Sequence, residues 1–321
     1  MRKQMSIIGI ALPVWLAFST APAWSDTRIE KNLALLPGGR LVVDVEGGSV
    51  DVRGTSESGA KVLITSSRDD IKDLYDFGFE ETQGMVRVTA KKKSGLYSFL
   101  SSLRGTSLRI DVQVPELTSL TLDTSGGGIK IAGTRGVAKA ETSGGSIDVS
   151  ALTGNLAAET SGGSISLAEI HGDAKAETSG GSIHVAALEG SLDAHTSGGG
   201  IDLKRVTGEI EASTSGGSVS IEEAGGRVHA ETAGGAMEVG FAKGNSGGGE
   251  VKCSGGSIRV AIDPSVSLTV DASASGGSVS SDIPVTGSDD RSRTVLRGSI
   301  GKGGQTLILR TSGGSIRIHP I

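Results

Sequence analysis

Serine beside glycine is the most frequent residue pattern in this chain that could do chemistry. The string TSGGSI, with small variations, begins at Thr124 and recurs every 18 residues up to Thr232, and one copy contains Ser143-Gly-Gly-Ser146. A serine nucleophile needs one activated copy with a base within reach. Because many near-equal copies are present, we interpret these serines as parts of a repeated corner and predict no catalytic residue among them.

Histidines could form a metal site. If the threonine is position 1 of an 18-residue unit, then His171, His184, His195 and His229 occupy positions 12, 7, 18 and 16. No two share a position, and His195 and His229 are two units apart, about 10 Å in a stack with strand spacing. That separation is too large for two ligands of one zinc ion. The GGxGxD repeat of calcium-binding solenoids is also absent, so we predict surface histidines and neither metal nor cofactor.

Acidic residues recur at two further positions. Position 18 contains Glu141, Glu159 and Glu177, and position 16 contains Lys139 and Lys175. Stacked glutamates about 5 Å apart repel, and a lysine two residues away on the same face can offset this. Two interpretations remain: a solvated, partly paired face, or a surface that binds a cation or a partner.

The segment Lys91–Leu100, KKKSGLYSFL, combines basic and aromatic residues. It could contact anionic lipid or glycan. It could equally be an insertion whose rings cover neighbouring structure, which is the interpretation we favour.

The alternation of apolar and polar positions within the 18-residue unit predicts the strands and corners that position these residues. Positions 3, 4 and 13 are glycine, which indicates corners that need a positive φ or a close backbone approach. Positions 1, 6, 8, 11, 15 and 17 are apolar or small, whereas positions 7, 16 and 18 are usually polar. A period of two predicts strands with one buried face, two or three of them per unit.

Position 1 is polar in most units, yet the alternation turns it inward. The same position holds Val45, Cys253 and Ala274 in other units, which is typical of a small buried site. We therefore expect the threonine hydroxyls to bond to backbone or to the next threonine. We also expect Thr178→Val to be tolerated.

The predicted fold is all-β: a right-handed, single-chain parallel β-solenoid with 18-residue coils. A left-handed hexapeptide helix also uses 18-residue coils, but it would repeat apolar residues every six positions. Residues 26–321 form one solenoid domain, with regular coils at 124–249. Insertions are expected at about 69–106, as an N-terminal cap, and at 284–297.

The first 25 residues predict export. Arg2 and Lys3 precede an apolar run over 7–18, and Ala21-Pro-Ala23 is a small-x-small cleavage site, so cleavage is expected near Ala23 or Ser25. An uncleaved anchor is the alternative. No later stretch could span a membrane, which leaves no transmembrane segment after cleavage. The expected location is periplasmic, extracellular or at the cell surface.

Composition narrows the function classes. The chain has 51 glycines, 3% aromatic residues, one cysteine and a formal charge of −5. A mildly acidic chain offers no basic footprint for nucleic acid. A compact core of this size normally contains more rings, so tight corners and small side chains must build the fold.

Three stretches carry a family resemblance: LLPGGRLVVDVEGGSVDVRG near the start, LRIDVQVPELTSLTLDTSGGGIKIAG at 108–133, and LRGSIGKGGQTLILRTSGGSIRIHPI at the end. With TSGGSI they resemble the bacterial exported "putative adhesin" β-solenoid family, a domain of unknown function, over about 32–321. The resemblance implies a β-helical fold and export, and it carries no catalytic residues.

The expected function is therefore that of a non-catalytic, adhesin-like structural or interaction protein of the cell envelope, whose partner is an envelope protein or glycan. The alternative is a carbohydrate-binding or carbohydrate-active β-helix protein, which would need clustered acids and aromatic platforms; the regular coils contain one aromatic residue, Phe241. An ice-binding solenoid with an exposed threonine array is a third possibility, against which the inward position 1 argues.

Overall fold

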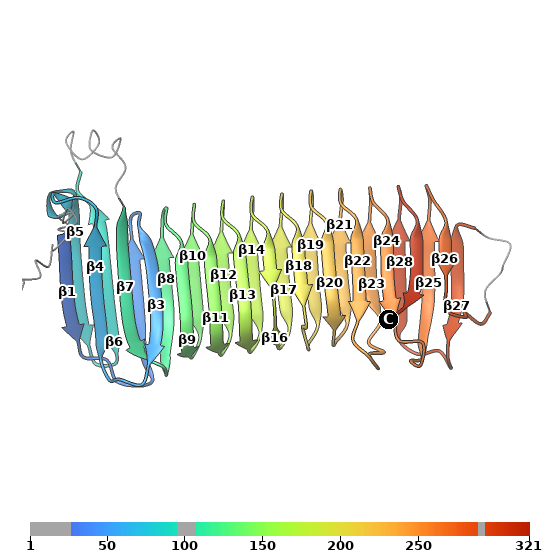
Figure 1. Cartoon of the computed structure of the whole chain (residues 1–321), viewed down its shortest axis with the longest axis horizontal. Coiled ribbons are helices and arrows are strands. Elements are labelled where there is room, and N and C mark those ends of the chain that lie inside the picture. Colours follow the sequence, from blue (N-terminus) through green and yellow to red (C-terminus); the bar gives the residue numbers. More distant parts are fainter. Residues whose placement is uncertain (1–26, 95–106, 288–292) are drawn as a thin grey trace, which may run out of the picture.

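The computed structural model describes residues 27–94, 107–287 and 293–321, and this part of the chain winds into a β-solenoid made of two long sheets (Figure 1). Each regular coil contributes one strand to each sheet, except that the coil from Thr178 contributes two short strands to sheet A. The all-β solenoid predicted from the repeat is confirmed. The coil has two sides, so the three-sided arrangement of a hexapeptide helix is wrong for this chain.

Sheet A has 15 strands. In spatial order they are β1 (Thr27–Leu33), β4 (Ala60–Ser66), β7 (Leu108–Pro115), β3 (Ser49–Thr55), β9 (Ile129–Arg135), β11 (Ile147–Thr153), β13 (Ile165–His171), β15 (Ile183–Val185), with β16 (Leu188–Glu189) also pairing with β13, then β18 (Ile201–Lys204), β20 (Val219–Ala224), β22 (Met237–Phe241), β24 (Ile258–Ile262), β29 (Ile316–Pro320) and β26 (Val279–Ser281).

Sheet B has 14 strands. In spatial order they are β27 (Val295–Ile300), β25 (Leu268–Ala274), β28 (Thr306–Thr311), β23 (Gly249–Cys253), β21 (Val228–Thr232), β19 (Ile210–Thr214), β17 (Leu192–Thr196), β14 (Ala174–Thr178), β12 (Leu156–Thr160), β10 (Ala138–Thr142), β8 (Thr118–Thr124), β2 (Gly39–Val45), β6 (Met85–Lys92) and β5 (Tyr75–Thr82).

Equivalent positions of successive coils stack in register to form columns. Thr142 pairs with Thr160 in sheet B, and Ile147 pairs with Ile165 in sheet A. The residues of columns 6, 8, 11, 15 and 17 are buried between the two sheets in the coils from Thr124 to Glu231. The prediction that regular coils extend to 249 is wrong, because Thr232 pairs with Cys253, 21 residues later, and Phe241 takes the buried place beside Ala224. A single coil cannot cover its own apolar face, so each coil depends on its neighbours for stability.

Glycine occupies columns 3, 4 and 13, and the backbone geometry requires it in columns 4 and 13. At column 13, Gly172 has φ +145° and a Cβ there would lie 2.5 Å from the carbonyl oxygen of Gly154. At column 4, a Cβ on Gly163 would lie 2.0 Å from the carbonyl oxygen of Gly145. At column 3 the closest atom to a Cβ on Gly162 is 3.6 Å away, an ordinary contact. The expectation of a corner constraint is therefore wrong for column 3 in this coil.

A bulge at column 10 explains why the buried columns jump from 8 to 11. Ala151 and Glu169 have φ of +50° and +56°, and Arg205 and Glu223 adopt the same left-handed conformation. Ala151 has no partner in the register between β11 and β13, whereas Ser150 and Leu152 on either side do. The extra residue reverses the alternation, so that column 11 points inward.

The predicted N-terminal cap is present. The segment after β4 forms a short helix, α1 (Ile71–Leu74), and the hairpin β5–β6, which extends sheet B beyond β2. The rings of Tyr75 and Phe77 stack with centroids 6.1 Å apart, and Tyr75 is buried. Of the basic-aromatic segment, residues 95–100 lie outside the described residues, while Lys91 forms an ion pair with Asp44 at 2.6 Å.

Candidate functional site

The threonine column is structural. The Oγ1 of Thr178 donates a hydrogen bond to the carbonyl of Gly163 in the preceding coil at 2.8 Å and accepts one from the N–H of Gly181 at 3.2 Å. Thr142, Thr160, Thr196, Thr214 and Thr232 repeat both bonds and are buried. The inward orientation is confirmed, and the hydroxyls bond to backbone. An exposed threonine array for ice binding is thus not present in these coils.

Cys253 reproduces this contact with sulfur. Its Sγ lies 3.0 Å from the carbonyl oxygen of Gly235 and 3.1 Å from the N–H of Gly256. A valine side chain can neither donate a hydrogen bond to the carbonyl nor accept one from the N–H. The two hydrogen bonds of Thr178 change the expectation for Thr178→Val: because Gly163 and Gly181 would both lose a part-buried partner, we now expect this variant to be destabilised.

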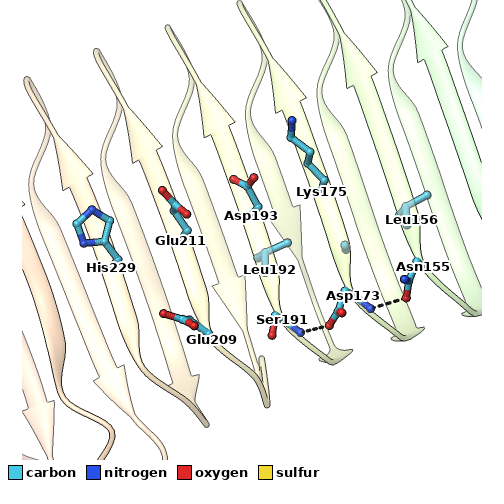
Figure 2. A pocket seen from close by; sticks show the side chains of 11 residues that line it. Asn155, Leu156, Asp173, Lys175, Ser191, Leu192, Asp193, Glu209, Glu211 and His229 are labelled. Carbon is cyan, nitrogen blue, oxygen red and sulfur yellow. Dashed lines mark hydrogen bonds between the residues drawn. The ribbon is translucent and has the colours of Figure 1, made fainter. Parts of the chain in front are cut away.

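The outer face of sheet B carries the polar side chains of columns 14, 16 and 18. A hollow of about 440 Å³ opens on this face across β12 to β21, and Figure 2 shows the side chains around it. The N–H of Asp173 donates to Asn155 Oδ1 at 3.2 Å, and the N–H of Ser191 donates to Asp173 Oδ1 at 2.8 Å. The remaining polar lining residues are Lys175, Asp193, Glu209, Glu211 and His229.

Lysines offset the acidic column as the sequence predicted. Lys139 lies 2.8 Å from Glu141, and Lys175 lies 2.8 Å from Glu177. The hydrogen bond to Glu177 raises the pKa of Lys175. Glu159 lies in register between Glu141 and Glu177, so the row remains acidic after this pairing.

Four of the five histidines lie apart from one another, each beside a carboxylate. His171 contacts Glu189 at 2.8 Å, His195 contacts Asp193 at 2.9 Å, His229 contacts Glu250 at 3.6 Å, and His184 and Asp202 are 4.0 Å apart. Within the described ranges, no group of three or more histidine, cysteine or acidic side chains could hold a metal ion. Each of these four histidines therefore acts as a partner for one acidic side chain, whereas the ring of His319 lies 3.0 Å from the Pro320 carbonyl oxygen.

One arrangement that the sequence reasoning missed resembles a catalytic triad. His195 Nδ1 is hydrogen-bonded to Ser213 Oγ in the next coil, and its Nε2 lies 2.9 Å from Asp193 Oδ1. A signal was present, because Ser213 follows His195 by one 18-residue period. A nucleophile of this kind also needs donors for a developing oxyanion.

In the described strands beside Ser213, the backbone donors are already used in the sheet. The backbone of β19 is paired in register with β17 over Ile210–Thr214, so its N–H groups are engaged in the sheet. Column 18 places Glu177 beside His195 and Glu231 beside Ser213, and both carboxylates would repel an oxyanion. This cluster supplies hydrogen bonds and charge on the surface of sheet B.

The described part of the chain contains no helix that is long and apolar enough to cross a membrane.

Comparison with protein families agrees with the fold. The sequence profile of Toastrack DUF4097 matches residues 39–319, which is most of the chain. The chain belongs to the Toastrack DUF4097 family. The match runs from β2 into β29, so the Toastrack domain includes both the cap and the C-terminal coils.

Solved structures similar to this Toastrack chain include two described as putative adhesins. One, from Bacteroides fragilis, is 12% identical, with 92% of this chain and 97% of that chain covered and a TM-score of 0.39. The other, from Parabacteroides merdae, is 12% identical, with coverage of 92% and 96% and a TM-score of 0.39. A putative cell adhesion protein from Clostridium sporogenes is 14% identical, with coverage of 92% and 100% and a TM-score of 0.21. No curated protein matches the chain.

Proposed function

We propose that this Toastrack protein is an exported, non-catalytic, adhesin-like protein of the cell envelope that binds its partner along the outer face of sheet B. The observation that carries the proposal is the continuous row of polar columns on that face. Asp44, Asp123, Glu141, Glu159 and Glu177 follow one another in column 18 on five adjacent strands. A rigid array of this kind suits a long ligand better than a small one.

Sheet A is the less suitable face. In the four coils from Thr124 to His195, its column 9 is formed by Ala132, Ser150, Ala168 and Ala186, which offer few donors or acceptors; Lys204 and Glu222 follow in the next two coils. Sheet B instead has the hollow lined by Asn155, Asp173 and Ser191 next to charged groups. Amide, carboxylate and hydroxyl groups can bind sugar hydroxyls, so a glycan is the second candidate partner beside an envelope protein.

Export is the part of the proposal that residues 1–25 support. The charged start, the apolar run and the Ala21-Pro-Ala23 site predict a mature N-terminus near Ala23 or Ser25. Intact-mass measurement of the protein from its native host tests this prediction. A mature chain that begins at Met1 would contradict it.

The non-catalytic role is tested by incubating the protein with envelope fragments and a panel of polysaccharides. We expect a bound fraction that sediments with the fragments and no products in the supernatant. Ser213→Ala is the informative variant, because Ser213 is the only serine shown here with a histidine partner among the described residues. Product formation by the wild type that this variant loses would overturn the proposal.

A further inference from the structure

Two rows of polar side chains border the hollow on the outer face of sheet B, one in column 14 and one in column 16 (Figure 2). The column-14 row is Asn155, Asp173, Ser191 and Glu209, and the column-16 row is Lys175, Asp193, Glu211 and His229. The rows are two residues apart along each strand, which is about 7 Å. Leu156, Ala174 and Leu192 of column 15 line the floor between them. A ligand that lies on this floor and contacts both rows is therefore about as wide as one sugar ring.

The column-14 row is held in place by the backbone and still has hydrogen-bonding groups to offer. Asn155 Oδ1 accepts the N–H of Asp173, and Asp173 Oδ1 accepts the N–H of Ser191. These bonds orient both side chains but use only one oxygen of each. Within the described residues, the Asn155 amide nitrogen, the second Asp173 oxygen and the Ser191 hydroxyl make no further hydrogen bond. The row can therefore bind the hydroxyl groups of a ligand without first rearranging.

The positively charged group of the lining is directed away from the hollow. The ammonium of Lys175 lies 2.8 Å from Glu177, and His229 lies 3.6 Å from Glu250. Neither of these two glutamates lines the hollow. The lysine and the histidine are thus already engaged by carboxylates outside it.

The carboxylates of the lining remain in excess. Asp193 has His195 at 2.9 Å, whereas Glu209 and Glu211 form no ion pair with any residue that the structure describes. Asp193 and Glu211 are register neighbours, so their side chains project from adjacent strands on the same face. Like charges in such positions repel. An ammonium group bound between the two strands would remove this repulsion, so the hollow favours a ligand that carries amines.

The hollow also repeats along the stack. Asn155, Asp173 and Ser191 belong to three consecutive coils, and neighbouring strands are about 4.8 Å apart. One sugar residue of an extended glycan advances by a similar distance. Successive sugars can therefore meet equivalent groups on successive coils.

We infer that this hollow binds a glycan of amino sugars with free, unacetylated amines, extended along the stack. The inference rests on the proposed function, because it names the ligand class for the same face. The rings lie over the column-15 floor, their hydroxyls meet the column-14 row, and their ammonium groups meet Glu209 and Glu211. No phenylalanine, tyrosine or tryptophan is among the described residues that line the hollow, so charge must supply the affinity that a stacking ring would give. A lysine-rich peptide fits less well, because one alkyl chain is too narrow to contact both rows of a hollow of about 440 Å³.

Calorimetric titration of the full chain with two probes tests the inference: a glucosamine hexamer with free, charged amines and the same hexamer fully N-acetylated. We expect the wild type to bind the free-amine hexamer more tightly by about tenfold or more, because acetylation removes the charge. Glu209→Gln combined with Glu211→Gln should weaken binding of the free-amine hexamer by a similar factor. Both forms of the protein should unfold at the same temperature.

A second double variant controls for general attraction to an acidic face. Glu159 and Glu231 lie on sheet B outside the hollow and also form no ion pair in the described part of the chain. Glu159→Gln combined with Glu231→Gln removes the same charge and should keep the affinity within about twofold of wild type. Equal affinity for the two hexamers, or an equal loss in both double variants, would overturn the inference.

A lysine hexapeptide distinguishes the ligand class. If it binds as tightly as the free-amine hexamer and loses affinity in the Glu209→Gln and Glu211→Gln variant, the hollow is a site for cationic peptides and the inference is wrong. Capture from envelope extracts is measured separately. A wild type that captures a partner but does not bind the hexamer refutes the ligand class alone, whereas one that captures nothing refutes the proposed function.

Discussion

At the scale of single residues, the threonine of column 1 shows how a polar side chain stabilises an apolar stack. Each hydroxyl joins the corner of its own coil to the corner of the coil before it. The sequence predicts that this column faces inward, because valine, cysteine and alanine also occur in it. It also predicts a partner in the backbone or in the next threonine, but not which backbone groups bond to the hydroxyl, because these depend on the conformation of the glycine corner.

Thr178→Val should destabilise the protein by about 1–3 kcal/mol, because it leaves the carbonyl of Gly163 and the N–H of Gly181 part-buried without their partner. Thr178→Cys should cost less, since Cys253 makes the same two contacts with sulfur. Urea unfolding of the two variants measures the difference. Equal midpoints would contradict the assigned role of the hydroxyl.

Thr134 is the opposite case. It is buried in column 11, where other coils have Leu152 and Ile170, and its hydroxyl has no hydrogen-bond partner. Thr134→Val should therefore stabilise the protein by about 1 kcal/mol. Thr118→Val is the matched control: its buried hydroxyl donates to the Pro115 carbonyl at 2.7 Å, so loss of that bond should lower the melting temperature.

At the scale of the coil, the corners are set by the distance between backbones more than by the choice of φ. Gly162 and Gly163 are adjacent, yet a Cβ fits at the first and collides with the preceding coil at the second. Gly163→Ala should cost several kcal/mol, because one coil must shift and disturb its neighbours. Gly162→Ala should stay within about 1 kcal/mol. Thermal melts that rank the two variants in the other order would contradict this account.

The C-terminal coil gives the solenoid a dependence on acid pH. The hydrogen bond from Arg310 lowers the pKa of Asp271 below 3.8. A carboxyl group with a depressed folded-state pKa stabilises the fold above its unfolded pKa, and this contribution is lost as the pH falls through the folded value. Asp271→Asn should thus cost on the order of 1 kcal/mol at pH 7. The difference from wild type in melts should shrink as the pH falls through the acid range in which Asp271 becomes protonated; a difference that stays constant with pH would rule out this pair as its origin.

At the scale of the whole molecule, the sequence predicts how each coil is built. It does not predict the spatial order of the strands at the two ends of the stack. The 18-residue period fixes which residues share a column, and even the contact of His195 with Ser213 follows from it. Columns are shared by all coils, so the sequence cannot tell which coils are neighbours. The insertion of β28–β29 and the pairing of β7 with both β3 and β4 needed the structure.

The candidate site was predictable only in part, for a related reason. Opposite charges two residues apart predicted the pairs of Lys139 with Glu141 and of Lys175 with Glu177. The hollow on sheet B depends on the sizes of side chains from several adjacent coils, including Glu209 and His229. The residue pattern within one coil therefore does not predict where the hollow lies.

The central claim, that sheet B is the binding face, is tested most directly by capture from envelope extracts with matched face variants. One triple variant neutralises Glu141, Glu159 and Glu177 on sheet B by substitution with glutamine. The control neutralises three outward-facing column-7 carboxylates on sheet A, of which Glu238 is exposed and the other two are half-buried: Asp148→Asn, Asp202→Asn and Glu238→Gln.

The account predicts that the sheet B variant loses at least tenfold in captured partner while the sheet A variant matches wild type, with both variants unfolding at the wild-type temperature. Undiminished capture by the sheet B variant, or equal loss by both, would contradict it.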